Sequence, residues 1–236
     1  MLLFLAAGIG VLFLAHTAPF PFLLEAFAPS RSIWHMPRQP NAEPLVYLTY
    51  DDGPNPAATP ELLDVLRETG AKATFFLIDA HLDDSTAPIV RRMFEEGHAV
   101  ALHADSRSLM IETPSDLAAY LTRNADRIAQ LGGQRPCRLF RPHAGWRGGS
   151  MYEGLAQIDH RLVGWSWGLW DWNWYRPQEA TGLARRLGAR ASSGDIIVMH
   201  DGHHVDPTPD RRYAIEATRL LVPALRSRGY SFGRLC

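Results

Sequence analysis

Short apolar runs alternate with helical patterns along this chain from Val46 onward, and this alternation constrains the fold most. We expect strands at Val46–Tyr50, Ala73–Ile78, His98–Leu102, Arg138–Arg141, Leu162–Trp167, Asp195–Met199 and Tyr230–Phe232. Helical patterns lie between them, near Pro60–Thr69, Ala87–Glu96, Pro114–Leu131, Met151–Gln157, Glu179–Arg190 and Arg212–Arg228. Alternation repeated this often predicts an α/β domain, with helices outside a parallel sheet that is either open or closed into a barrel.

The length and charge of the chain limit the number of its domains and the kind of partner that it can bind. It has 236 residues, which suits one catalytic domain with a short appendage. The formal net charge is −1 and no basic stripe is present, which argues against nucleic acid as a partner. We therefore expect a folded globular domain whose main partner is not nucleic acid.

The first 24 residues contain no Asp, Glu, Lys or Arg. A bilayer span needs about 20 apolar residues, and this segment just reaches that length. However, no Lys or Arg precedes the apolar run as in a signal peptide, and Pro19 and Pro21 interrupt its second half. An uncleaved anchor, a cleaved signal and an apolar helix packed on the domain remain open, and we favour membrane association. Residues 25–43, rich in proline, are predicted to be a linker before a domain at 44–236.

The chain has two cysteines, Cys137 and Cys236. Two cysteines do not make a disulfide scaffold, and no CxxC pair indicates a zinc knuckle. Cys137 begins an apolar run and is typical of a small buried hydrophobic residue. A Cys137–Cys236 disulfide is the alternative if the domain lies outside the cytoplasm.

Polar residues at the ends of the predicted strands are the candidates for chemistry, because a parallel sheet places its ligand there. The first strand ends in Asp51 and Asp52, followed by Gly53 and Pro54. Adjacent carboxylates at the end of a buried strand are costly unless each has a partner, such as a metal for one and a base role for the other. The alternative is an ordinary turn, since Asp-Asp-Gly-Pro is also good turn chemistry.

Later strands end in further candidates. His103 follows the third strand and suits a transition-metal ion, although a lone His is more often a surface residue. Arg141 ends the fourth strand and can hold a carboxylate with two hydrogen bonds. His200 ends a later strand and could act as a general acid if a carboxylate such as Asp171 fixes its tautomer.

Five tryptophans fall within residues 165–174. Aromatic faces stack on sugar rings, so this stretch indicates a carbohydrate cleft. A packed aromatic rim over the core is the alternative, and both can hold together.

Together these strand ends resemble the polysaccharide deacetylases of the NodB-homology type, also called family-four carbohydrate esterases. The resemblance covers roughly residues 44–236. Its best part is Thr49-Tyr50-Asp51-Asp52-Gly53-Pro54, close to the family's TFDDGP, and Lys72–Leu77 and Gly229–Phe232 also look typical. It implies a distorted (β/α)7-type barrel, here preceded by an apolar N-terminal helix.

The resemblance also implies roles for individual residues. Asp51 would be the catalytic base and Arg141 its partner, while Asp52 and His103 would bind the metal. His200 would protonate the leaving amine, with Asp171 tuning it. The Ala144 N–H would help to form the oxyanion hole, and Trp172 and Tyr50 would contact substrate.

Two positions depart from the family pattern. The second metal-binding His of the family falls at position 107, where this chain has Arg107, and an arginine cannot ligate a cation. We expect Asp105 to supply the third ligand, with His143 or Asp201 as alternatives. The other departure is Arg141-Pro142-His143-Ala144-Gly145, where the family has Arg-x-Pro-Tyr-Gly; the backbone donor at Ala144 survives that change.

The resemblance implies a metal-dependent hydrolase that removes N-acetyl groups from amino sugars in a peptidoglycan- or chitin-like polysaccharide. Zinc is the expected cation, with cobalt, nickel or manganese as alternatives. The expected partners are the polysaccharide and, through the N-terminal segment, a membrane; we expect a monomer with its catalytic domain outside the cytoplasm. The alternatives are a catalytically impaired glycan-binding protein on the same barrel and a hydrolase of non-sugar amides.

Overall fold

A computed structural model of the chain describes Gly8 and residues 32–38, 43–168 and 179–236. Asp171, Trp172 and, apart from Gly8, the predicted anchor or signal segment lie outside these residues. Within the described part, no helix combines the length and apolar character that crossing a membrane requires.

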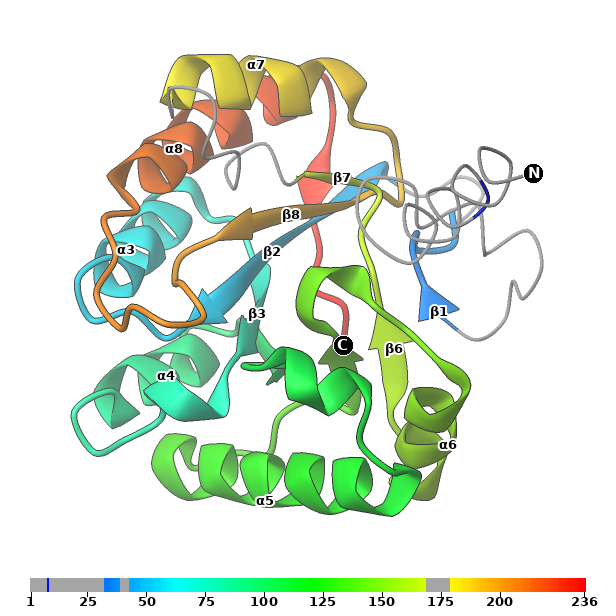
Figure 1. Cartoon of the computed structure of the whole chain (residues 1–236). Coiled ribbons are helices and arrows are strands. Elements are labelled where there is room, and N and C mark those ends of the chain that lie inside the picture. Colours follow the sequence, from blue (N-terminus) through cyan, green and yellow to red (C-terminus); the bar gives the residue numbers. More distant parts are fainter. Residues whose placement is uncertain (1–7, 9–31, 39–42, 169–178) are drawn as a thin grey trace.

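Parallel strands form one continuous sheet in the order β1-β6-β5-β4-β3-β2-β8-β7, and β9 pairs with the start of β2. The strands are β1 Ser32–Ile33, β2 Leu45–Gly53, β3 Ala73–Leu77, β4 Ala99–His103, β5 Leu139–Arg141, β6 Arg161–Val163, β7 Trp167–Gly168, β8 Ile196–His200 and β9 Ser231–Phe232. Every strand pair is parallel. The sheet curls into a distorted barrel, as the strand–helix alternation and the resemblance predict (Figure 1).

Helices surround the strands on the outside (Figure 1). They are α3 Thr59–Thr69, α4 Ala87–Glu95, α5 Pro114–Gly132, α6 Gly149–Gln157, α7 Ala180–Arg190 and α8 Arg212–Ser227, with short 3₁₀ turns η1 Asp79–His81, η2 Arg107–Met110 and η3 His143–Gly145. Local signals set their ends: Thr113 caps α5 by accepting from the Asp116 N–H, and Gly70 ends α3 in the left-handed conformation. The helical patterns of the sequence therefore fall on real helices.

One predicted strand, Leu162–Trp167, is two strands with different partners. β6 pairs with β5, and after three residues the same run continues as β7, which pairs with β8. The run Arg161–Gly168 thus connects the two flanks of the curled sheet, and we call it the seam. A sequence pattern alone does not reveal this change, because both halves are apolar.

Residues 32–36, within the predicted linker, form what we call the N-terminal strap. Ser32 and Ile33 pair with Leu162 and Val163 of β6, and the Met36 N–H donates to the Gly194 carbonyl at 2.8 Å. The strap therefore crosses the seam and belongs to the sheet, unlike the extended linker that the prolines predict.

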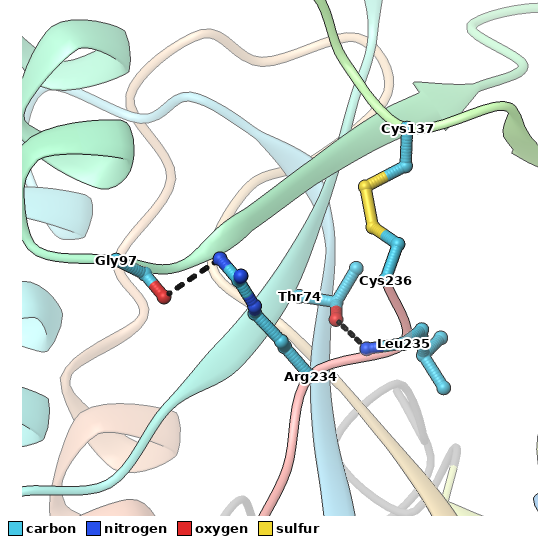
Figure 2. Close-up of a disulfide and its surroundings, with 6 residues drawn as sticks. All are labelled: Thr74, Gly97, Cys137, Arg234, Leu235 and Cys236. Carbon is cyan, nitrogen blue, oxygen red and sulfur yellow. Dashed lines mark hydrogen bonds between the residues drawn. A yellow bond between two sulfur atoms is a disulfide. The ribbon is translucent and has the colours of Figure 1, made fainter.

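The C-terminal segment closes the end of the barrel opposite the strand carboxyl ends. The Leu235 N–H donates to Thr74 Oγ1 at 3.0 Å, and Cys236 forms a disulfide with Cys137, with 6.3 Å between their Cα atoms (Figure 2). Of the two roles considered for Cys137, the structure adopts the disulfide, which links positions 99 residues apart.

His98 lies at the same end, and its titration should make stability depend on pH. Burial, with the charges of Lys72 and Arg92, lowers the pKa of His98 from 6.5 to about 4, and its Nδ1 accepts the Ala73 N–H at 3.2 Å. Between pH 6.5 and 4 the unfolded chain therefore binds a proton at His98 that the folded chain does not bind. The free energy of unfolding falls as the pH drops through this range. We expect a loss of about 2 kcal/mol between pH 7 and pH 4.5 in urea unfolding. His98→Asn retains an acceptor without this titration, and an equal loss in that variant would contradict the assignment.

Candidate active site

A bulge at the end of β2 brings two carboxylates to the same place. Asp51 pairs with Phe76 of β3 and Gly53 pairs with Leu77, so Asp52 is an extra residue with φ 67°. Neighbouring side chains on a regular strand point to opposite faces, and a bulge re-aims one of them. As a result, both Asp51 and Asp52 approach His103, with their nearest oxygens 3.9 and 3.2 Å from its Nε2.

Two glycines make room for this bulge. A Cβ on Gly202 would lie 1.9 Å from the Asp52 carbonyl oxygen, and a Cβ on Gly53 would lie 2.7 Å from an Asp201 carboxylate oxygen. Asp201 is itself buried and accepts a hydrogen bond from Thr59, and burial raises its pKa to about 7. The turn after β8 therefore packs directly on the backbone of the bulge at Asp52 and Gly53.

Arg141 is fully buried and holds Asp51 in place. Its Nη1 donates to Asp51 Oδ1 at 2.5 Å and to Thr49 Oγ1 at 2.8 Å, and its Nη2 donates to the Gly164 carbonyl at 2.8 Å. The guanidinium also lies 4.0 Å from the centre of the Phe76 ring. Contacts in three directions fix the guanidinium, and through it the Asp51 carboxylate.

His103 and Asp52 form a pair that suits a cation. His103 Nδ1 lies 2.7 Å from the Arg141 carbonyl, which can only accept, so Nδ1 carries a proton. When His103 is neutral, Nε2 presents a lone pair toward Asp52 Oδ1, a buried oxygen that has no hydrogen-bond partner among the described residues. Two facing acceptors need a positive centre between them, either a proton on Nε2 or a metal ion. The residues therefore fit a metal ion.

The electrostatics of the pair agree with this reasoning. Burial alone would lower the pKa of His103, but the carboxylates of Asp51 and Asp52 outweigh it and raise that pKa. Burial would raise the pKa of Asp52, yet its contact with His103 and the imidazoles of His200 and His143 hold it well below its usual range. Five polar side chains from three strand ends and the turn after β5 thus act on one another.

His200 and His143 complete the buried part of the site. His200 ends β8 directly beside Asp51, its partner in the β2–β8 register. His143 begins η3, and its ring centre lies 4.9 Å from that of His204 in the loop after β8. The structure thus places His200 beside Asp51, and the catalytic role of each stays a prediction.

Ala144 lies exposed in η3 with a left-handed backbone, at φ 53°. Gly145 follows at φ 72°, and a Cβ there would lie 2.7 Å from the Trp165 ring. This tight turn follows directly after Arg141 and Pro142, so the backbone at Ala144 faces the same end of the barrel as the carboxylates.

Two predicted site residues have other partners. Asp105 is half-buried and accepts a hydrogen bond from the Tyr120 hydroxyl at 2.9 Å. Among the described residues, no three His, Cys, Asp or Glu side chains already converge as a metal site, so its role as third ligand stays a prediction. Tyr50 is fully buried: it stacks on Phe75, and its hydroxyl lies 2.8 Å from Thr218 of α8. It packs between the sheet and α8, so we do not carry a substrate-binding role forward.

Sequence reasoning gave no supporting role to three groups at the site, although Trp165 belongs to the tryptophan-rich stretch that it singled out. Thr49 and the Gly164 carbonyl hold Arg141, and Trp165 is buried beside the η3 turn. Thr49 could have been found, because it lies two residues before Asp51 and so shares its face of the strand. Gly164 had no such signal, since it acts through its backbone.

The chain matches the polysaccharide deacetylase family over residues 38–163. It is 34% identical to the chitooligosaccharide deacetylase of Sinorhizobium fredii, over 83% of this chain and 92% of that protein. It is 28% identical to the peptidoglycan-N-acetylglucosamine deacetylase of Bacillus cereus, over 82% and 87% of the two chains. A family 4 acetyl xylan esterase from Clostridium thermocellum, solved with a cobalt ion, superposes with a TM-score of 0.71 at 31% identity, covering 81% and 88% of the two chains. The bulged aspartate pair, the buried arginine and the parallel barrel thus occur in a chain that belongs to the polysaccharide deacetylase family.

Proposed function

We propose that this protein is a hydrolase that removes N-acetyl groups from amino sugars in a peptidoglycan- or chitin-like polysaccharide. The observation that carries this proposal is that the two adjacent carboxylates have different partners. Asp51 is held by Arg141, whereas Asp52 faces His103 and suits a cation. The relatives named for peptidoglycan and chitooligosaccharide deacetylation support the substrate class.

Asp52 and His103 would hold a divalent metal ion, with Asp105 or His143 as candidates for a third ligand. When bound, such an ion polarises a carbonyl oxygen and makes water more acidic. Zinc is our first choice, with cobalt, nickel or manganese as alternatives, and the cobalt complex of a relative supports a divalent transition metal.

Asp51 would act as the base that accepts the proton of the attacking water. A base must lie at a fixed distance from the proton that it removes, and the contacts of Arg141 with Asp51, Thr49 and the Gly164 carbonyl supply that rigidity. The Ala144 N–H would donate a hydrogen bond to the oxygen on which negative charge develops.

His200 would deliver a proton to the departing amine, so that the carbon–nitrogen bond breaks and acetate leaves. Its place beside Asp51 in the β2–β8 register supports this role. The roles of Asp171, as the partner that orients His200, and of Trp172, as a wall of the cleft, stay predictions.

We infer that the catalytic domain works outside the cytoplasm. Disulfides persist in oxidising compartments, and Cys137 and Cys236 form one. The charge-free residues 1–24 would then serve as a membrane anchor or an export signal.

A non-catalytic glycan-binding protein is the second candidate. It is favoured by the lack of three converging His, Cys, Asp or Glu side chains among the described residues. Metal content separates the two functions, because a binder needs no stoichiometric ion and the hydrolase does.

Acetate release from N-acetylglucosamine oligomers tests the proposal. We expect chelation to lower the rate by at least about 100-fold, the usual cost of losing one electrostatic stabiliser, and re-added zinc or cobalt to restore it. Acetylated xylan, run in parallel, distinguishes an amide substrate from an ester. Equal rates with and without chelator, or no bound metal with tight oligomer binding, would refute the proposed hydrolase.

A further inference from the structure

The N-terminal strap ties into the seam at the residue that anchors Arg141. The Gly164 N–H donates to the Ile33 carbonyl at 2.8 Å, while the Gly164 carbonyl accepts from Arg141 Nη2 at 2.8 Å. The Ser166 hydroxyl in turn donates to the Trp34 carbonyl at 2.8 Å. Gly164 therefore connects the strap directly to the guanidinium that holds Asp51.

Trp34 is the large side chain of the strap, and it is 7% exposed. Its ring lies so close to Gly164 that a Cβ there would come within 1.8 Å of it. Glycine is thus the only residue type that fits at position 164 under the ring. The ring in turn fixes the backbone that carries the Gly164 carbonyl, which accepts from Arg141.

Trp34 also reaches the turn that carries Ala144. The Arg147 guanidinium lies 4.3 Å from the centre of the Trp34 ring, three residues after Ala144. Trp165 meets Trp34 edge-on at 5.9 Å between ring centres and touches the turn at Gly145. One buried ring therefore contacts the seam under Arg141 directly, and it reaches the η3 turn through Arg147 and Trp165.

We propose that Trp34 is a positioning residue, which holds Arg141 and the Ala144 turn in the geometry that the reaction requires. This inference rests on the proposed hydrolase function. The strap precedes residues 38–163, which match the family, so the family match assigns it no role. Trp34 does not contact Asp51; it acts through Gly164, Arg147 and Trp165.

The test compares Trp34→Ala, Trp34→Leu and Trp34→Phe in the full chain. A displacement of about 1 Å in a catalytic group can cost roughly 100-fold in rate, so we expect Trp34→Ala to lower kcat by about 10- to 100-fold with KM nearly unchanged. Trp34→Phe retains a flat ring and should restore kcat to within about threefold of the wild type. If Trp34→Ala does not fold, Trp34→Leu, which also lacks the flat ring, takes its place in the comparison of kcat with the wild type.

Ile33→Ala is the matched control, because neighbouring strand residues point to opposite faces and this change retains the backbone bond to Gly164. Its kcat should stay at the wild-type value. In an Arg141→Lys background, Trp34→Ala should cost less than it does alone, because both changes disturb the same anchor. Full additivity, or a melting temperature that falls in Trp34→Ala while kcat does not, would overturn the proposal.

Hydrogen exchange provides a readout that needs no substrate. Loss of the Trp34 ring should speed exchange in residues 161–168 without affecting residues 73–77 of β3. If the wild type releases no acetate, the proposed function fails. Hydrogen exchange still tests whether the Trp34 ring stabilises residues 161–168. Unchanged exchange at 161–168 in Trp34→Ala would overturn the strap's part in either case.

Discussion

Asp51→Asn is expected to lower kcat for acetate release by roughly 10²- to 10⁴-fold, the range that a positioned general base contributes. Asparagine retains an oxygen that can accept from Arg141, so the side chain should stay in place while its ability to accept a proton is lost. KM should change little, because the carboxylate acts on water and not on the sugar. Initial rates on N-acetylglucosamine oligomers, with metal saturating, provide the measurement.

The variant also leaves the fully buried Arg141 without a counter-ion, and breaking a buried pair costs about 3–5 kcal/mol of stability. Rates must therefore be taken well below its melting temperature. Asp64→Asn is the control: Asp64 also pairs with an arginine, Arg92, but on the surface, and this change should leave kcat as it was. A loss of less than tenfold in Asp51→Asn would exclude Asp51 as the base.

Removing the Cys137–Cys236 disulfide should destabilise the domain by about 4 kcal/mol, since the bridge closes a loop of 99 residues. The contacts that also hold this segment include the two strand residues of β9 and the bonds from the Gly233 N–H to the Val46 carbonyl and from the Leu235 N–H to Thr74. Leu235 is 8% exposed and belongs to the core. Release of the segment would therefore expose to water the end of the barrel opposite the strand carboxyl ends.

Urea unfolding with and without a phosphine reductant measures this effect. The double variant Cys137→Ala and Cys236→Ala should match the reduced wild type and should not respond to reductant. Because the disulfide lies at the end of the barrel opposite the carboxylates, kcat at low temperature should not change. If the oxidised and reduced proteins unfolded at the same urea concentration, the disulfide would have no part in stability.

Much of the fold was predictable because its signals are local. Apolar runs bounded by turn residues correspond to β2, β3, β4, β5 and β8, and helical periodicity located the six long helices. The candidates Asp51, Asp52, His103, Arg141 and His200 could be selected from the sequence because they stand at the ends of apolar runs, and the carboxyl ends of parallel strands meet at one edge.

Other features depend on contacts that no local pattern encodes. The bulge at Asp52 explains how adjacent carboxylates share a site, yet it rests on space left by Gly202, 150 residues away in the chain. Tyr50 adjoins the aspartates in sequence, but strand alternation turns it toward Thr218. The strap could not be predicted from the pattern, because the prolines on either side of it, Pro29 and Pro37, suggest a linker, whereas its partner in the sheet is Leu162.

That pairing has a consequence for folding kinetics. Ser32 and Leu162 are distant in sequence, and the strap cannot dock until β5, β6 and β8 have assembled. Contacts across such separations form late, because the entropy of closing the intervening chain must be met first. Interactions absent from the transition state slow unfolding without speeding folding. We therefore expect loss of the strap to speed unfolding of the barrel and to have little effect on the folding rate.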